Sequence, residues 1–419
     1  MSRLVLALCL VFPSIASSVA QQPMPGDWVV GDLGQTHNGA LFFDPSASPP
    51  APLTTLTIGG QGYINWIRMH PNNTDLLVNY AGIGQFGSLT VPGGVFTSIM
   101  AIQDSPNGQA LDQDGTILVS TSGGNQLWRI DPLLAVATLL ASLPATVNNV
   151  CIDLDTGEIQ VAIFDMGPVS NGKVLRLSRS GTVLGTRASG LGMTSSVDFD
   201  PVSGDFFVTT FTTPEVRKIH RTGTVTRVAL FPGANAVKVD QETGNLMVCG
   251  MNRTARMNGL GQVLHGENHA HICTGGQFNW SSVEIYGSSK LTGFGPAKPG
   301  TRYNLNLNFP ASGNRGYAIL ASLTGMRPGI RLNDNSGRVI SLMPDNFFFM
   351  VLTLQGLPGI FKYFTGMLNA RGYPAGPAPV VDIPGYIPGG LRVYFAAVAL
   401  NPLMSAGLDV SNPWAFTVQ

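Results

Sequence analysis

A short segment that ends in valine and has a strand-like composition recurs six times within the first 285 residues. The intervals between successive valines are 48, 41, 42, 47 and 40 residues. Periods of about 40 to 50 residues with several short strands each are typical of β-propeller blades. One strand precedes most of these segments across an Asp/Gly turn and two follow, so the repeats predict six four-stranded blades, with a solenoid as the alternative. The six valines are Val30, Val78, Val119, Val161, Val208 and Val248.

The first repeat begins at its second strand, so its innermost strand has to come from elsewhere. Residues 276–280 echo residues 62–66, which predicts that this late segment completes the first blade and closes the ring. Closure removes the sheet edges that would otherwise invite aggregation. The innermost strands are predicted to carry four apolar residues near the propeller axis, namely Ala110, Val150, Val197 and Val237.

The repeats end near Tyr286, and a stretch rich in Gly, Ser and Pro follows to residue 300, which indicates a domain boundary. Beyond it, short apolar segments alternate with turns, a pattern typical of an antiparallel sandwich. Residues 347–352, Phe-Phe-Phe-Met-Val-Leu, are predicted to form a central strand buried on both faces. The expected fold class is therefore all-β: a six-bladed β-propeller over residues 21–285, followed by an antiparallel β-sandwich over residues 286–419.

The composition supports a turn-dense β protein. The chain has 51 Gly and 29 Pro, and only 11% of its residues are charged, which excludes a coiled coil or an all-helical protein. Residues after Glu284 carry ten Lys or Arg and four Asp, whereas the preceding residues carry fourteen basic and twenty acidic side chains. Neither part has a run of Lys and Arg, so nucleic acid is not expected as a partner.

The N-terminus has the organisation of a secretory signal peptide. A basic start, an apolar run from Leu4 to Phe12 and a small-residue exit at Ala20 predict cleavage after residue 20. We therefore expect a secreted, periplasmic or cell-surface protein with no transmembrane segment. The mature chain would keep three cysteines, Cys151, Cys249 and Cys273, so at most one disulfide can form; whether Cys249 pairs with Cys273 is left open, as is the oligomeric state.

Two parts of the chain resemble known families. Residues 105–115, Ser-Pro-Asn-Gly-Gln-Ala-Leu-Asp-Gln-Asp-Gly, resemble the inner-strand signature of NHL-type propellers, which gluconolactonase-like and streptogramin-lyase-like propellers share. Residues 286–287, 387–398 and 411–414 resemble a C-terminal module of bacterial secreted proteins. The first resemblance implies a propeller of this class, and the second implies an accessory or surface role for the tail.

Polar residues recur at the starts of the innermost strands. Aligning the repeats places them around one mouth of the channel, where neutral amides and hydroxyls can satisfy the strand ends or bind a polar ligand. In gluconolactonase-like enzymes this mouth holds a divalent metal through Glu, Asn and Asp, whereas the carboxylates Asp112, Asp153, Asp198 and Asp240 are assigned here to turn ends. The candidate ligand-binding residues are Asn65, Asn107, Asn149, Ser196, Asn235 and Asn279.

A histidine-rich segment lies between the last repeat and the closing strand. On a strand, His265, Glu267, His269 and His271 would share one face and could bind Mg²⁺, Ca²⁺ or Zn²⁺. The resemblance to streptogramin-lyase-like propellers, which use a Glu and a His with magnesium, implies Glu267 and His269 as catalytic residues. A solvated connecting loop is the alternative.

Three hypotheses for function follow. The favoured one is a secreted or cell-envelope propeller that binds a small molecule, a glycan or a protein at its face and carries an accessory sandwich. The second is a metal-dependent lactonase or lyase acting at the channel mouth. The third is a structural envelope protein.

Overall fold

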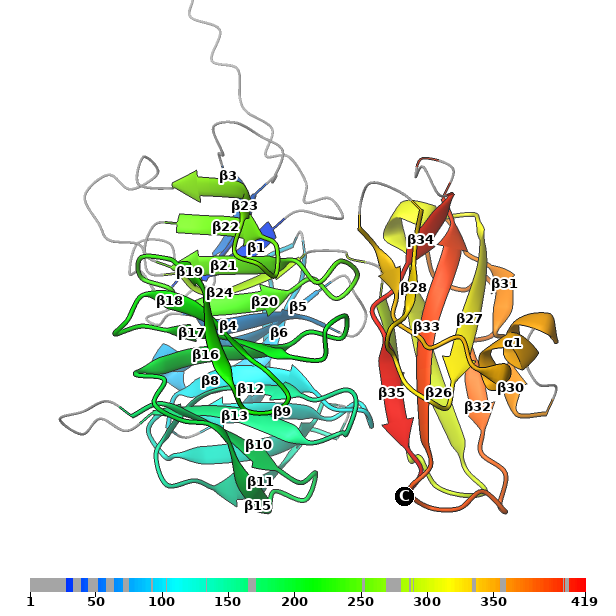
Figure 1. Ribbon diagram of the computed structural model, residues 1–419, viewed down its shortest axis with the longest axis horizontal. Coiled ribbons are helices and arrows are strands. Elements are labelled where there is room, and N and C mark those ends of the chain that lie inside the picture. Colours follow the sequence, from blue (N-terminus) through cyan, green and yellow to red (C-terminus); the bar gives the residue numbers. More distant parts are fainter. Residues whose placement is uncertain are drawn as a thin grey trace, which may run out of the picture.

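The structure is a computed structural model and is built almost entirely from antiparallel strands (Figure 1), which confirms the predicted all-β class. It describes residues 28–32, 39–43, 52–57, 64–70, 75–91, 93–102, 104–132, 134–164, 171–250, 253–268, 280–285, 288, 290–333, 337–354, 359–401, 403 and 407–419. Among these residues, no helix is long and apolar enough to cross a membrane. The predicted signal peptide, residues 1–20, and Cys273 lie outside the described residues.

Six four-stranded sheets, or blades, form the part before residue 286. The first blade contains β24 (Trp280–Ile285), β1 (Trp28–Asp32), β2 (Gly39–Phe43) and β3 (Pro52–Thr57). The second contains β4 (Ile64–Met69), β5 (Leu76–Tyr80), β6 (Gln85–Leu89) and β7 (Phe96–Ala101), with a short 3₁₀ turn at Ala81–Ile83. The third contains β8 (Pro106–Leu111), β9 (Ile117–Thr121), β10 (Gln126–Asp131) and β11 (Val136–Ser142).

The remaining three blades follow the same order from the innermost strand outward. They are β12 (Thr146–Ile152), β13 (Ile159–Phe164), β14 (Lys173–Leu177) and β15 (Val183–Ala188); β16 (Thr194–Phe199), β17 (Phe206–Thr210), β18 (Glu215–Ile219) and β19 (Val225–Leu230); and β20 (Ala236–Val239), β21 (Leu246–Gly250), β22 (Arg253–Met257) and β23 (Val263–Asn268).

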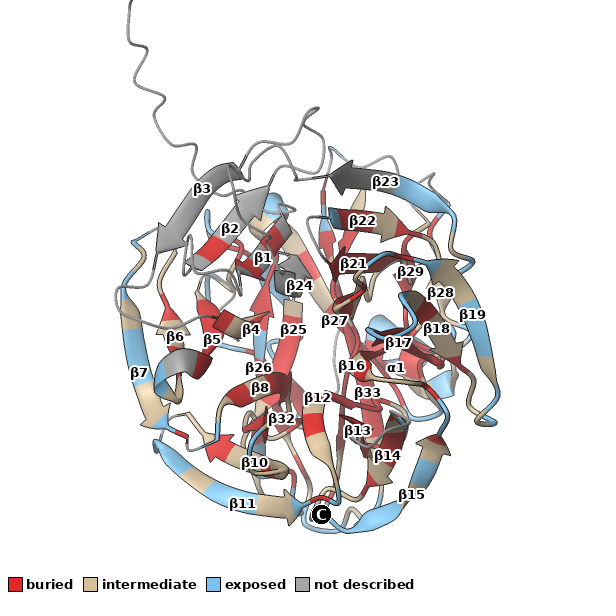
Figure 2. Ribbon diagram, turned by 90° about the vertical axis from the view of Figure 1, so that its left-hand side faces the viewer, coloured by how far each residue is buried: buried red, intermediate tan, exposed pale blue. Residues whose placement is uncertain are grey.

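The innermost strands form a closed ring around the propeller axis (Figure 2). Each of β24, β4, β8, β12, β16 and β20 contacts the next, and β20 contacts β24. The late strand β24 pairs antiparallel with β1, Trp28 lying opposite Ile285, so the predicted ring closure is confirmed, with the closing strand beginning at Trp280. The predicted inner-strand residues Ala110, Val150 and Val197 do lie on innermost strands, and so does Val237.

Arginine–aspartate pairs join neighbouring blades. In the third blade, the completely buried Asp112 accepts hydrogen bonds from Arg129 of its own blade (2.9 Å) and from Arg179 of the next blade (3.0 Å). One blade further on, the buried Asp153 accepts from Arg221 (2.8 Å) in the same way. Both aspartates occupy the turn after an innermost strand, and Asp side chains readily hydrogen-bond within such turns. The same side chain therefore shapes its own turn and fastens the adjacent blade.

The C-terminal sheet pair, residues 290–419, consists of two antiparallel sheets packed face to face. One sheet contains β25 (Lys290–Phe294), β26 (Arg302–Asn308), β32 (Val380–Asp382) and β30 (Phe361–Lys362). The other contains β31 (Thr365–Met367), β27 (Gly316–Ser322), β33 (Arg392–Leu400), β34 (Leu408–Val410) and β35 (Trp414–Thr417). The short strands β28 (Ile330–Arg331) and β29 (Val339–Ile340) form a hairpin, and a 3₁₀ turn spans Pro310–Ser312. Tyr303, Phe395 and Phe416 lie in the core between the sheets.

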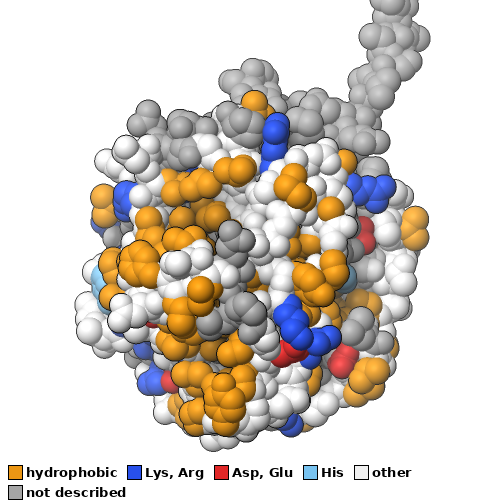
Figure 3. All heavy atoms as spheres, turned by 90° about the vertical axis from the view of Figure 1, so that its right-hand side faces the viewer, with side chains coloured by type: hydrophobic (Ala, Val, Ile, Leu, Met, Phe, Trp, Pro, Cys, Tyr) orange, Lys and Arg blue, Asp and Glu red, His pale blue; other side chains and the backbone are white. Residues whose placement is uncertain are grey.

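The predicted central strand at residues 347–352 is wrong, because this segment is the helix α1 (Asn346–Thr353). Asp345 caps the helix: its side chain accepts a hydrogen bond from the backbone N–H of Phe348 (2.7 Å). An uninterrupted apolar run fits a helix as well as a strand, and the cap decides between them here. Phe348 is buried, but Phe349 and Leu352 are about half exposed, on the face of the sheet pair turned away from the propeller, where hydrophobic side chains gather (Figure 3).

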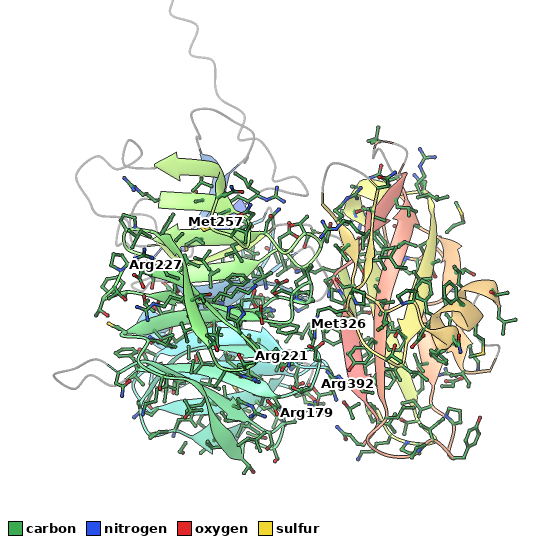
Figure 4. The ribbon with its side chains drawn as sticks, viewed as in Figure 1. Arg179, Arg221, Arg227, Met257, Met326 and Arg392 are labelled. Atoms are coloured by element: carbon green, nitrogen blue, oxygen red, sulfur yellow. The ribbon has the colours of Figure 1, made fainter. Side chains whose placement is uncertain are left out.

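The sheet pair packs on one face of the propeller through a shared apolar core and polar contacts. Arg392 reaches into the propeller (Figure 4), donates to the carbonyl of Leu154 (2.8 Å), and lies beside Tyr394, whose hydroxyl donates to the carbonyl of Asp155 (3.0 Å). Asp155 also binds Arg327 of the sheet pair. The turns that follow the innermost strands make these contacts, so the sheet pair covers the mouth of the channel at which those strands end.

Candidate functional site

The predicted amide residues lie at the other end of the innermost strands, facing away from the sheet pair. Side chains there link one blade to the next: Asn65 Nδ2 donates to the Pro106 carbonyl (3.1 Å), and Asn107 Nδ2 donates to Asn148 Oδ1 (3.2 Å). A β-bulge occurs at this point in each of β4, β8, β12 and β16. Bulges re-aim side chains, and here they recur at the same register position in these four blades.

The six aligned residues do not form one ring, because the strand register places Asn148 and Ser195 at the positions equivalent to Asn65 and Asn107. Asn149 and Ser196 lie one position beyond the equivalents of Asn65 and Asn107, and their side chains bond the neighbouring inner strand: Asn149 Oδ1 accepts from the Val197 N–H (3.2 Å), and Ser196 Oγ from the Val237 N–H (3.3 Å). The backbone of Asn235 bonds Cys249. Asn279 lies outside the described residues, and the ligand-binding role of the set stays a prediction.

A different set of residues forms a ring at the covered end of the channel. Each member of this ring lies on an innermost strand, opposite a residue of the second strand of its blade. That opposite residue is the one just before the recurring valine, as Leu77, before Val78, lies opposite Arg68. One of them, Asp198, was assigned from the sequence to a turn end, but Asp200 occupies that turn, and Asp198 lies on β16. The sequence signal for this ring is a charged residue between apolar residues at equivalent repeat positions, as in Ile67-Arg68-Met69 and Val237-Lys238-Val239. The ring consists of Arg68, Ala110, Cys151, Asp198, Lys238 and, by the backbone register of β24 opposite Val29, Glu284.

Three neighbouring cavities lie near this ring, and two of them are lined by its residues. The largest, the groove, has a volume of about 650 Å³ and lies between the second and third blades and strands β25 and β26. The chamber, of about 100 Å³, lies between the ring and the sheet pair and shares Leu111, Lys290 and Thr292 with the groove. The hollow, of about 10 Å³, lies inside the channel and shares Arg68, Asp198 and Lys238 with the chamber. The three cavities thus adjoin one another in sequence, here called the cavity path, from the junction of propeller and sheet pair to the propeller axis.

Two buried amides line the hollow with one atom each left without a partner among the described residues. Gln109 Nε2 donates to the Leu77 carbonyl (3.1 Å), which leaves Gln109 Oε1 unbonded. Asn149 Oδ1 accepts from Val197, which leaves Asn149 Nδ2 unbonded. A buried polar group without a hydrogen bond costs about 1–3 kcal/mol. An acceptor and a donor therefore border a space that holds about one water molecule or one polar group of a ligand.

The ring brings opposite charges into the chamber. Lys238 Nζ lies 3.5 Å from the Asp198 carboxylate, and both side chains are mostly buried. Arg68 donates to the Gln109 carbonyl (3.0 Å) and has no carboxylate partner among the described residues. Burial raises the pKa of the Cys151 thiol well above its ordinary value, and Asp198 and Asp153 add to the shift. Cys151 is therefore a protonated wall residue and not a reactive thiolate.

Glu242 supplies a carboxyl group to the wall of the chamber. Its backbone carbonyl accepts from the Val339 N–H of the sheet pair (2.8 Å), while no described residue hydrogen-bonds its carboxyl group. Burial raises the pKa of Glu242 well above its usual range; Asp240 and Asp409 raise it further, against the opposing effect of Arg338 and the more distant Arg256. The carboxyl group is consequently kept protonated to a higher pH than an exposed glutamate.

Replacing Glu242 with glutamine is expected to stabilise the protein near neutral pH. The folded-state pKa is raised, so the folded protein binds more protons than the unfolded chain, and stability is lost as the pH rises from the unfolded pKa through the folded one. Glutamine stays neutral and avoids this loss. Thermal melts should show a higher Tm for Glu242→Gln at pH 7.5 and the same Tm as wild type at pH 4; an equal Tm at both values would contradict the assignment.

The histidine-rich segment is only partly described. The backbone of His265 and Glu267 lies on β23, the outermost strand of the last blade, opposite Arg256 and Thr254. Their side chains, and His269 and His271 altogether, lie outside the described residues. Among the residues that the structure does describe, no three His, Cys, Asp or Glu side chains are grouped as metal ligands. The metal and catalytic roles of this segment stay predictions.

Comparison with known proteins identifies the fold and nothing finer. No family model and no curated protein matches the sequence. A chain of a nidogen–laminin complex superposes with a TM-score of 0.51 at 14% identity, covering 62% of this chain and 98% of that one. A Bacteroides caccae protein of unknown function superposes with a TM-score of 0.48 at 15% identity, covering 62% of this chain and 98% of that one. A protein provisionally assigned to the gluconolactonases superposes with a TM-score of 0.44 at 17% identity, covering 60% of this chain and 86% of that one. The superposition on the chain of the nidogen–laminin complex agrees with the β-propeller fold.

Proposed function

We propose that this chain is a secreted or cell-envelope β-propeller protein that binds a small molecule in the cavities between the propeller and the C-terminal sheet pair. The observation that carries the proposal is the pair of unbonded atoms, Gln109 Oε1 and Asn149 Nδ2, which border the hollow at the end of the cavity path. Ligand sites are commonly cavities at the junction of two structural units, with a few polar groups converging on an apolar wall. Of the predicted partners, a small molecule fits this space. Secretion rests on residues 1–20.

Binding is tested with the fluorescent dye anilinonaphthalene sulfonate, which reports occupancy of an apolar cavity. The wild-type protein should bind the dye saturably at one site per chain. Ala378 is exposed and lines the groove, so Ala378→Trp fills the entrance and should weaken the dye affinity at least about tenfold. Ala370→Trp, at an exposed position that does not line the groove, is the control and should bind like wild type. No saturable binding, or equal binding by both variants, would refute the proposal.

A further inference from the structure

The groove has the wall chemistry of a site for an apolar chain. Its volume, about 650 Å³, lies within the range of about 300–1,000 Å³ that is common for ligand pockets. Partly exposed apolar residues from both units line it, namely Ile99 and Leu111 of the propeller and Phe294 of the sheet pair. An alkyl chain placed here would remove these surfaces and its own from water.

The chamber at the inner end of the groove has a different chemistry. Arg68, which lacks a carboxylate partner among the described residues, borders it together with the Lys238–Asp198 pair and Glu242. An arginine guanidinium presents a planar fork of N–H donors that matches a carboxylate. Glu242 adds a carboxyl group from another wall. The chamber therefore offers donors and a positive charge to one small acidic group.

The groove and the chamber adjoin each other, because Leu111 and Thr292 line both of them. A ligand that occupies both would place one end in each. A doubly charged phosphate head would meet Asp198 and Asp240 as well as Arg68, whereas a carboxylate is smaller and carries one charge. We propose that the ligand is an amphiphile with a carboxylate head, bound with its head at Arg68 in the chamber and its chain in the groove. This inference rests on the proposed function and specifies the ligand class.

The test compares three probes by isothermal titration calorimetry: decanoate, decyl maltoside and acetate. Decanoate should bind more than about a hundredfold more tightly than acetate, because only its chain occupies the groove. It should also bind at least about tenfold more tightly than decyl maltoside, whose neutral head has no charge for Arg68 and exceeds the chamber in size. In Arg68→Met the decanoate affinity should fall at least about tenfold. Ala378→Trp should weaken decanoate binding while leaving the head contacts in place.

Arg331→Met is the matched control, because Arg331 is exposed on β28 and lines none of the three cavities. It should bind decanoate like wild type. Melting curves of each variant establish that it is folded. Two results would overturn the proposal of a carboxylate amphiphile while the proposed function stands, provided that the dye binds in the groove. One is that decanoate binds no more tightly than acetate or decyl maltoside, and the other is that Arg68→Met keeps the wild-type affinity for decanoate. If the dye also fails to bind, both proposals are refuted.

Discussion

Replacing Arg221 with alanine is expected to lower the free energy of unfolding by about 3 kcal/mol. Arg221 donates two hydrogen bonds to Asp153 (2.8 and 2.9 Å), and the Asp153 side chain is completely buried. Removing one partner of a buried ion pair leaves an uncompensated charge and typically costs 3–5 kcal/mol. The lower end applies because Arg187 lies 3.8 Å from Asp153 and still offsets part of its charge.

Urea unfolding at pH 7, followed by tryptophan fluorescence, measures this loss. Arg227→Ala is the control, because Arg227 is 62% exposed at the outer side of the propeller (Figure 4) and lies 3.7 Å from its partner Glu215. Exposed pairs of this kind contribute about 0–1 kcal/mol. If Arg221→Ala is no less stable than Arg227→Ala, the arginine–aspartate pairs do not hold the blades together.

A second substitution probes the contact between blades at the backbone. Gly181 lies in the turn between β14 and β15 with φ of +87°, and a Cβ added there would lie 2.1 Å from the Leu140 carbonyl oxygen of the preceding blade. Gly261 repeats the arrangement against Val228 at the same distance. Gly181→Ala is expected to cost about 3 kcal/mol: about 1 from the left-handed backbone and about 2 from the overlap, which has to push the two blades apart.

Gly190→Ala separates these two contributions. Gly190 has φ of +70°, but a Cβ there meets no atom within 4 Å. Its alanine variant should therefore lose only the backbone share, about 1 kcal/mol. Differential scanning calorimetry of both variants gives the comparison. If both variants lose the same free energy of unfolding, the contact between the Gly181 turn and the preceding blade does not contribute to stability.

The propeller was predictable from the sequence because its determinants are local. Each blade repeats a period-two apolar pattern, an Asp/Gly turn and a valine strand, and each of these depends on residues within a few positions of one another. The echo of residues 62–66 in residues 276–280 also indicated which strand closes the ring. The helix at 346–353 was missed because its apolar run has no period of its own, and its cap, Asp345, is one polar residue among several near that point.

The candidate site was decided by the tertiary structure. The sequence directed attention to the strand starts, where amides recur, and of these residues Asn149 does line the hollow. The chamber lies instead at the strand ends, where Arg68, Asp198 and Lys238 come from three different blades. No local pattern indicates that the sheet pair would pack over this mouth and leave a groove beside it. The repeats therefore determined the ring of blades through local strand and turn preferences. Only the packing of the propeller against the sheet pair created the enclosed space and gathered the charges within it. Contacts between the two units join residues far apart in the chain, such as Arg392 and Leu154, which are 238 residues apart.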